Sequence, residues 1–174
     1  SVKGLYGVSR EPPTGFVRAI PGPEYDNFDA AAQAYFWNND WTISPTSNRM
    51  GCRLNDNAKN TATPALTSRS QQGSNSDNKG NMNSHAVFPG VVQVPADGNP
   101  IILLADAQTT GGYPRIATVI QADLWQLSCL PPNTAVRFIR CDPQTAINAL
   151  KTRQYDQHRL TLAVAHSLTR QTTE

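Results

Sequence analysis

A dense group of polar and glycine residues lies in one short segment, directly after the apolar run from Ile101 to Ala105. The segment combines an acid, an amide, two hydroxyls, two glycines, a phenol and a guanidinium, in the order Asp106, Gln108, Thr109, Thr110, Gly111, Gly112, Tyr113 and Arg115. Loops that follow a rigid buried strand often carry binding or catalytic groups, because the scaffold fixes their position. We therefore expect the functional site at this segment.

The part of the segment from Thr109 to Gly112 has two interpretations. Two successive glycines permit backbone conformations that point several N–H groups into one concavity, where they would bind an anion. The lysine and the glycine spacing of a phosphate-binding P-loop are absent from it. The simpler interpretation is a glycine-rich turn whose hydroxyls satisfy their own backbone. The sequence leaves both interpretations open.

Asp106 and Gln108 are two residues apart, so at the end of a strand their side chains project from the same side. Together with Arg49 or Arg115 they would hold a small polar substrate through charge-assisted hydrogen bonds. The alternative for Asp106 is a turn residue, or a buried acid paired with one arginine. Tyr113 would either donate a hydrogen bond from its hydroxyl or wedge its ring into the mouth of a barrel.

Other classes of site are not indicated by the sequence. His85, His158 and His166 lie far apart and form no Ser-His-Asp or metal-ligand pattern, so no catalytic residue and no metal ligand is assigned. The three cysteines show no Cys-x-x-Cys spacing, and we expect reduced thiols in a cytoplasmic protein. A net charge of +2 comes from scattered Lys and Arg, which gives no basis for nucleic-acid binding. The apolar runs fall far short of the roughly 20 residues that a membrane-spanning helix needs.

The apolar patterns predict several short strands and few helices. The expected strands lie at 15–20, 41–44, 50–54, 87–94, 101–105, 116–121 and 134–140. Apolar residues at helical spacing predict three helices. The first starts after Asp26, and the second starts after Asp123, which would cap it. The third starts at Asp142-Pro143 and would continue to Leu168. This order favours a mainly β fold, a barrel with two or three peripheral helices, over a parallel βαβ sheet.

Two segments fall outside this pattern. Residues 1–14 contain several glycines and prolines, and the sequence begins with Ser1 rather than Met, so we expect a linker from a missing N-terminal half. Residues 55–84 are dominated by Asn, Ser, Thr, Gln and Gly. They predict a mobile insertion, because they cannot bury enough apolar surface to offset the entropy of ordering. Residues 15–174 would then form a single domain around that insertion.

Three motifs resemble those of one protein family. The run QVPADGNPIILLADAQTTGGYPRIATVIQADL, which starts at Gln93, is similar to the signature of the allophanate hydrolase subunit 2 family. That family is also known as the biotin-dependent carboxyltransferase domain and as the C subunit of bacterial 5-oxoprolinase. The elements VRAIPGP at Val17 and SNRMGCRL at Ser47 occur in the family's order and support the resemblance. It covers roughly residues 15 to 145 and corresponds to the C-terminal half of such proteins.

The resemblance implies a closed, cyclophilin-like β-barrel that acts in a cytoplasmic, heteromeric complex. Its partner would be the B subunit of that complex, a protein similar to allophanate hydrolase subunit 1, and its substrate a small amide or lactam. Family members take part in the ATP-dependent opening of 5-oxoproline or in the transfer of a carboxyl group from carboxybiotin to urea. No cofactor would bind this chain directly: the complex would use ATP, and carboxybiotin only if it is of the urea carboxylase type. This part alone would be inactive.

The resemblance also implies a set of substrate-binding residues. These are Arg49, Gln93, Asp106, Gln108, Thr109, Thr110, Gly111, Gly112, Tyr113 and Arg115. In this hypothesis Arg49 or Arg115 binds a carboxylate or a developing oxyanion, and the turn from Gln108 to Gly112 supplies neutral donors to the amide oxygen. Asp106 would orient that turn.

The sequence departs from the family at three places, and each departure removes a charge. Ala107 stands where the family often has arginine, Asn48 replaces an acid, and His85-Ala86 stands where Glu-Gly is common. An alternative function therefore stays open, a non-catalytic regulatory module that binds a partner protein as an antagonist of a histidine-kinase inhibitor. A prolyl isomerase is a third hypothesis, which rests on analogy of fold alone.

Overall fold

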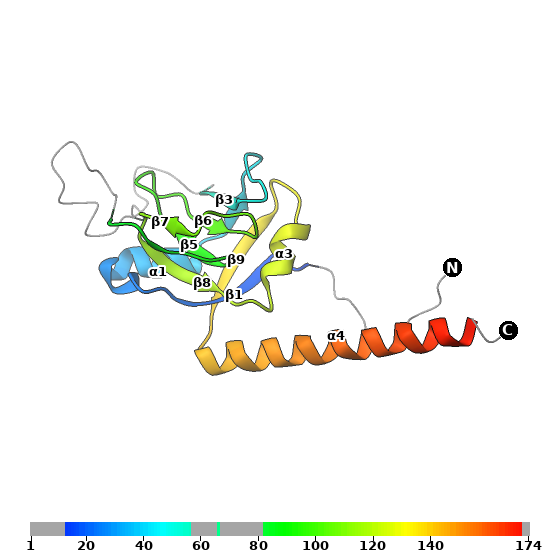
Figure 1. The fold of residues 1–174 in the computed structure, drawn as a ribbon. Coiled ribbons are helices and arrows are strands. Elements are labelled where there is room, and N and C mark those ends of the chain that lie inside the picture. The colour runs from blue at the N-terminus through cyan, green and yellow to red at the C-terminus, as the bar shows by residue number, and fades with distance from the viewer. Residues whose placement is uncertain (1–12, 57–65, 67–81, 172–174) are drawn as a thin grey trace.

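The fold is a closed β-barrel with helices at its periphery, seen in a computed structural model that describes residues 13–56, 66 and 82–171 (Figure 1). The barrel strands are β1 (Phe16–Pro21), β2 (Trp41–Ile43), β3 (Gly51–Asp56), β5 (Val91–Gln93), β6 (Ile101–Leu103), β8 (Arg115–Val119) and β9 (Ala135–Arg140). Their order around the barrel is β1-β8-β5-β6-β3-β2-β9, and the barrel closes through the parallel pairing of β1 with β9. The expectation of a mainly β, closed barrel is confirmed.

Alternation along the strands sorts the side chains into two faces. In β3, Cys52 and Leu54 are buried in the main core, and Arg53 between them is exposed. In β5 and β6, Val92 and Ile102 belong to the same core. The strand periodicity of two therefore directs the intervening residues of β3, β5 and β6 to the outer face of the barrel.

A small second sheet covers part of that outer face. It pairs β4 (His85–Ala86) with β7 (Thr110–Gly111), and the segment from Val87 to Gly90 then turns into β5. Val87, Val91 and Leu103 form a second apolar cluster against Ile101 and Ala107. The sequence predicted a bent strand over 87–94 that is entered through a turn at Pro89-Gly90. The structure has that turn, in which Gly90 adopts a φ of 100°, and the regular strand β5 begins after it at Val91.

The helices are η1 (Tyr25–Asn27), α1 (Ala30–Asn38), α3 (Leu124–Cys129) and α4 (Pro143–Gln171). The first predicted helix begins at Ala30 rather than after Asp26, because the Asp29 side chain accepts a hydrogen bond from the backbone N–H of Ala32 and caps it there. Phe36 of α1 stacks on Phe138 of β9, with their ring centroids 4.5 Å apart, and so fixes α1 to the core.

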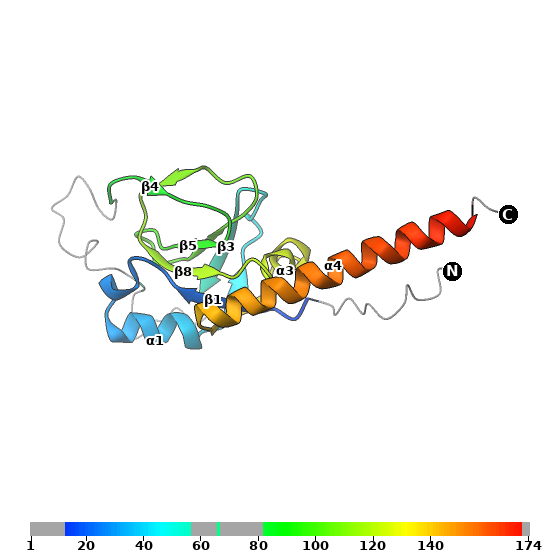
Figure 2. The ribbon, with the colours of Figure 1, turned by 60° about the horizontal axis from the view of Figure 1, so that its bottom comes forward.

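The expected cap of α3 was wrong, because the Asp123 side chain makes no capping hydrogen bond. Its carboxylate instead accepts hydrogen bonds from the backbone N–H and the guanidinium of Arg18 on β1. The cap of α4 is as predicted, since Asp142 accepts from the backbone N–H of Thr145 at 2.8 Å. Helix α4 then runs past the barrel and projects from it (Figure 2). Arg153 attaches it by donating to the carbonyl of Ala122.

The linker expected at residues 1–14 and the insertion expected at 55–84 lie largely outside the described residues. Within the latter range, Asn55 and Asp56 belong to β3, and Leu66 is buried in the main core. None of the described helices is both long enough and apolar enough to span a membrane.

Candidate functional site

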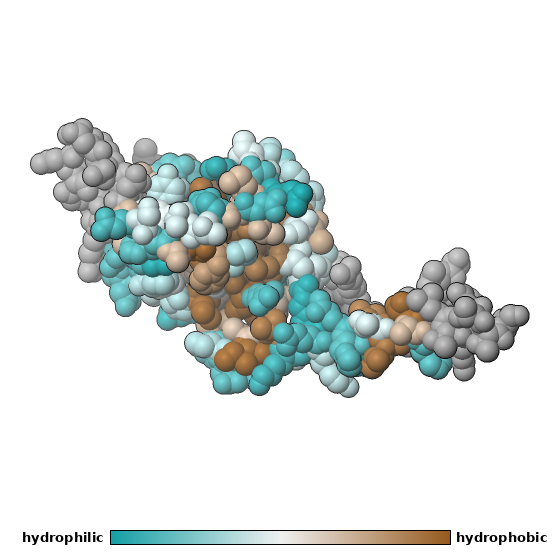
Figure 3. Space-filling view, viewed as in Figure 1, coloured by the Kyte–Doolittle hydropathy of each residue, from teal (hydrophilic) through white to brown (hydrophobic). Residues whose placement is uncertain are grey.

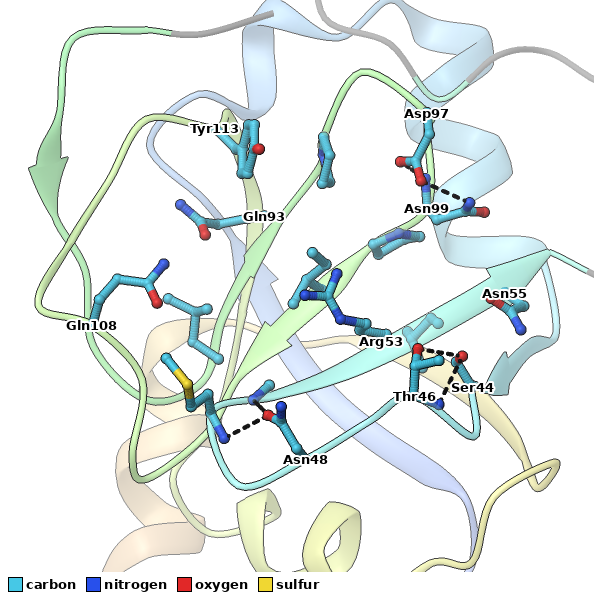
Figure 4. A pocket seen from close by; sticks show the side chains of 17 residues that line it. Ser44, Thr46, Asn48, Arg53, Asn55, Gln93, Asp97, Asn99, Gln108 and Tyr113 are labelled. Atoms are coloured by element: carbon cyan, nitrogen blue, oxygen red, sulfur yellow. Dashed lines mark hydrogen bonds between the residues drawn. The ribbon is translucent and has the colours of Figure 1, made fainter.

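A polar cavity of about 420 Å³ lies on the outer face of the barrel, over β3, β6 and β5 (Figure 4). Strand register builds its floor: Arg53 of β3 pairs with Ile101 of β6, which pairs in turn with Gln93 of β5. Adjacent strands are about 4.8 Å apart, so Arg53 and Gln93 stand about 10 Å apart on either side of Ile101. An apolar centre is thus flanked by a cation on one side and an amide on the other.

Amide, hydroxyl and carboxyl side chains form the walls of this outer-face cavity. The polar lining residues are Ser44, Thr46, Asn48, Arg53, Asn55, Gln93, Asp97, Asn99, Gln108 and Tyr113. Figure 4 shows the side chains of Gln93, Gln108 and Tyr113 on one side of the cavity and those of Asp97 and Asn99 on another, with Arg53 between the two groups. Such a lining can donate and accept several hydrogen bonds at once, as a small polar ligand requires.

Gln93 is the most constrained of these residues. Its residue surface is 2% exposed, and its Nε2 is the one buried side-chain nitrogen or oxygen that lacks a hydrogen-bond partner among the described residues. An unpaired buried donor costs about 1–3 kcal/mol, so the surrounding structure must stabilise this side chain in its position. The backbone of Gly111 passes directly over this amide.

Three of the ten residues expected at the site line the outer-face cavity, namely Gln93, Gln108 and Tyr113. Arg49 and Asp106 are brought together outside the lining, where the Arg49 Nε lies 3.0 Å from a carboxylate oxygen of Asp106. The Arg49 side chain is 86% exposed, so this ion pair lies in solvent.

The backbone from Thr109 to Gly112 is engaged in pairing with the preceding segment. Thr110 and Gly111 form β7 against β4, and the carbonyls of Thr109 and Gly112 accept hydrogen bonds from the backbone N–H groups of Val87 and Met82. The segment thereby holds Gln108 and Tyr113, which lie on either side of it, at the wall of the cavity.

Arg115 lies apart from the cavity and forms a nearly buried ion pair. Its guanidinium donates to both carboxylate oxygens of Glu24, at 2.7 and 2.5 Å, and to the carbonyl of Ala86 at 3.1 Å. Burial opposes ionisation of Glu24, but these hydrogen bonds outweigh it and hold the pKa of Glu24 below its ordinary value. The pair therefore joins β8 to η1 and β4.

Sequence reasoning missed Arg53, Asn55 and Asn99, and noted Asn48 only as a departure from the family. A signal for Arg53 was present, because Cys52 and Leu54 are apolar neighbours that direct it to the opposite face of a strand. The Asn48 side chain accepts hydrogen bonds from the backbone N–H groups of Met50 and Gly51. An amide oxygen can thus hold this turn in place of the acid that the family prefers.

A second hollow, between the barrel and the first turns of α4, is apolar (Figure 3). Ile20, Phe88, Leu124, Ile147 and Leu150 are among the residues that line it. It offers few groups for chemistry. In the part of the chain that the structure describes, no three His, Cys, Asp or Glu side chains are grouped to hold a metal ion.

Solved structures define the class of fold. Urea amidolyase and urea carboxylase of Kluyveromyces lactis superpose with TM-scores of 0.72 and 0.70, at 20% and 21% identity. The matches cover 90% and 83% of this chain but 9% and 12% of those large proteins. The barrel therefore has the fold of a segment of urea carboxylase-type enzymes.

The chain belongs to the family of carboxyltransferase domains, subdomains A and B, whose model matches residues 6–140. It is 43% identical over 139 residues to the C subunit of 5-oxoprolinase from Escherichia coli and 40% identical over 132 residues to that from Haemophilus influenzae. These matches cover 79% and 76% of this chain, and 40% and 38% of the two relatives. The chain thus spans well under half the length of either relative, and the whole of α4 lies beyond the family match.

Proposed function

We propose that this chain is the barrel part of a protein similar to the C subunit of 5-oxoprolinase, and that its outer-face cavity binds a small amide or lactam. The observation that carries the proposal is the lining of the cavity, in which Gln93, Gln108 and Tyr113 converge beside an apolar floor at Ile101. The names of the two bacterial relatives support the same reaction class. Neither these relatives nor the described site favours the non-catalytic alternative.

The cavity residues have the chemistry that an amide substrate needs. A lactam presents one carbonyl acceptor and one N–H donor, and carboxamide side chains complement both. We assign Gln108 and the Tyr113 hydroxyl to the carbonyl oxygen, where fixed neutral donors stabilise negative charge as it develops. Gln93 would complete the polar wall, because its side chain lies on the same side of the cavity as Gln108 and Tyr113.

The remaining expected site residues have supporting roles in this proposal. The backbone of Thr109, Thr110, Gly111 and Gly112 positions Gln108 and Tyr113 through the pairing of β7 with β4. The pair of Arg49 and Asp106 lies next to the cavity, between the β3 turn and the end of β6, and would restrict the approach to it.

The other components of the reaction are assigned to a larger complex. The cavity has one cationic side chain in its described lining, Arg53, so it fits a small ligand and not a triphosphate. We propose that ATP is used by partner proteins, among them one of the B-subunit type, similar to allophanate hydrolase subunit 1. Carboxybiotin would be required only if the substrate is urea, and no residue is assigned to it.

A chimeric enzyme tests the proposal. Residues 6–140 of this chain would replace the matching segment of the C subunit from E. coli, and the chimera would be assembled with the other components of that enzyme. We expect ATP-dependent formation of glutamate from 5-oxoproline. Incubation with ATP, urea and bicarbonate, with and without avidin, tests the urea branch, since avidin captures biotin and would block a biotin-dependent carboxylation. An assembled complex that consumes neither substrate would contradict the proposal.

A pair of variants locates the site within the chimera. Gln108→Ala removes a donor from the cavity wall and should lower kcat/KM by about 100-fold, the lower end of the range typical for loss of one oxyanion donor. Asp40→Asn changes an exposed acid outside the cavity lining and serves as the control. Equal activity of the two variants would remove Gln108 from the site.

A further inference from the structure

Arg53 differs from every other arginine whose side chain the structure describes. Four of the others pair with carboxylates, namely Arg18, Arg49, Arg115 and Arg137. Arg153 donates to a backbone carbonyl, and the guanidinium groups of Arg140 and Arg159 lie over aromatic rings. No ion pair or side-chain hydrogen bond joins the Arg53 guanidinium to the described residues, although its backbone is held by Ser47 and Ser44. An available guanidinium is thus fixed by its backbone at the edge of a cavity.

The position of Arg53 relative to the amides gives it a specific ligand. It stands across Ile101 from Gln93, and Figure 4 shows its guanidinium extending from β3 into the space between Gln93 and Asn99. The one carboxylate in the described lining, Asp97, accepts two hydrogen bonds from Asn99. A guanidinium forms its strongest hydrogen bonds with a carboxylate, in a bidentate arrangement.

We propose that Arg53 is a specificity-determining residue that selects ligands carrying a carboxylate, so that the cavity takes an anionic lactam in preference to a neutral amide. This inference rests on the proposed function, because it names the group that binds opposite the amide end of the same substrate. The lactam carbonyl would meet Gln108 and Tyr113, and the carboxylate would meet Arg53. Urea has no carboxylate and would leave Arg53 unpaired.

Titration of the whole 174-residue chain with small ligands tests the inference. Chemical-shift changes in ¹H–¹⁵N spectra would be followed for 5-oxoproline, for 2-pyrrolidinone, which is the same ring without the carboxylate, and for urea. We expect 5-oxoproline to bind about 10- to 100-fold more tightly than 2-pyrrolidinone, the ratio that one charge-assisted contact supplies. Arg53→Met should remove this ratio and leave the affinity for 2-pyrrolidinone unchanged.

Three further variants make the result specific to Arg53. Arg53→Lys keeps the charge without the bidentate geometry and should retain an intermediate preference. Lys151→Met removes one positive charge from the exposed surface of α4 and should change nothing. Arg49→Met tests the neighbouring arginine directly. If Arg49→Met abolished the preference and Arg53→Met did not, Arg53 would not be the selecting residue.

The outcomes separate this inference from the proposed function. Equal affinity of the unaltered chain for 5-oxoproline and 2-pyrrolidinone, with shifts at the cavity, would overturn the role of Arg53 and leave a lactam site standing. Binding of neither lactam at millimolar concentration would overturn the lactam site and the role of Arg53 together. Spectra of Arg53→Met that match the unaltered chain away from the cavity would show that the variant is folded.

Discussion

Gly111 and Gln93 approach each other so closely that a Cβ atom on Gly111 would lie 2.4 Å from the Nε2 of Gln93. The two residues belong to different sheets, since Gly111 is in β7 and Gln93 is in the barrel strand β5. No real Cβ contact is this short, so position 111 requires glycine as long as Gln93 keeps its conformation. The small sheet is therefore fitted to the amide that forms one edge of the cavity.

Gly111→Ala should destabilise the protein by about 1–3 kcal/mol, as is typical when extra atoms are forced into a packed site. Equilibrium unfolding in urea measures the change in free energy. Gln93→Ala removes the side chain that the new methyl group would strike, so the double variant should be more stable than the sum of the two single changes predicts. Strict additivity would mean that the clash is relieved in another way.

The ion pair of Glu24 with Arg115 should make stability depend on pH in the acid range. Because the pKa of Glu24 is held below its ordinary value in the folded protein, its contribution is present above the unfolded pKa and is lost as pH falls through the folded one. Glu24→Gln cannot titrate and should flatten the loss of stability below about pH 4.5. Urea unfolding at a series of pH values checks this, and identical slopes for both proteins would refute it.

Two bidentate ion pairs in different surroundings should differ in their effect on stability. The N–O distances of the two ion pairs are similar, 2.7 Å for Arg18 with Asp123 and 2.6 Å for Arg137 with Asp40. Asp123 is nearly buried, whereas Asp40 and Arg137 are both exposed. Asp123→Ala should cost about 1.5–3 kcal/mol, because it leaves charged donors without their acceptor. Asp40→Ala should have a much smaller effect, since water replaces the lost partner. Equal losses in thermal or urea unfolding would contradict this explanation.

The free cysteines should react with thiol reagents at very different rates. Cys129 is exposed, while Cys52 is buried in the main core and burial raises its pKa to about 11. At pH 8 the thiolate form that reacts is therefore scarce and shielded at Cys52. Ellman's reagent should modify Cys129 within the mixing time of a manual assay and Cys52 only after unfolding. The variant Cys129→Ser should lack the fast phase of thiol modification. A fast phase that persists in this variant would show that it does not come from Cys129.

The strands could be predicted from sequence wherever one face is buried, because alternation at Ala135–Arg140 or a continuous apolar run at Ile101–Leu103 reflects local burial. The partners of charged residues could not be predicted in the same way. Arg115 looked like a ligand-binding residue and Asp123 like a helix cap, yet their partners Glu24 and Arg18 lie 91 and 105 residues away. Only the closed barrel brings these side chains together.

The candidate site shows the same division between local and distant information. Gln108 and Tyr113 could be selected from their own segment, because a polar loop after a buried strand often carries function. Arg53 lies on another strand, and its place beside Gln93 follows from the register of β3, β6 and β5, which the sequence does not specify. The alternation of apolar residues around Arg53 could have predicted that its side chain lies on the outer face of the strand, but not which residues surround it there.

The parallel pairing of β1 with β9 has a consequence for how the protein is made. The first barrel strand leaves the ribosome long before its partner, so it must wait with an open edge until Arg140 has been translated. Contacts between such distant parts of a chain form slowly. We therefore expect β1 to pair with β9 only after the whole barrel has been synthesised. Until then, chaperones would shield the unpaired edge of β1.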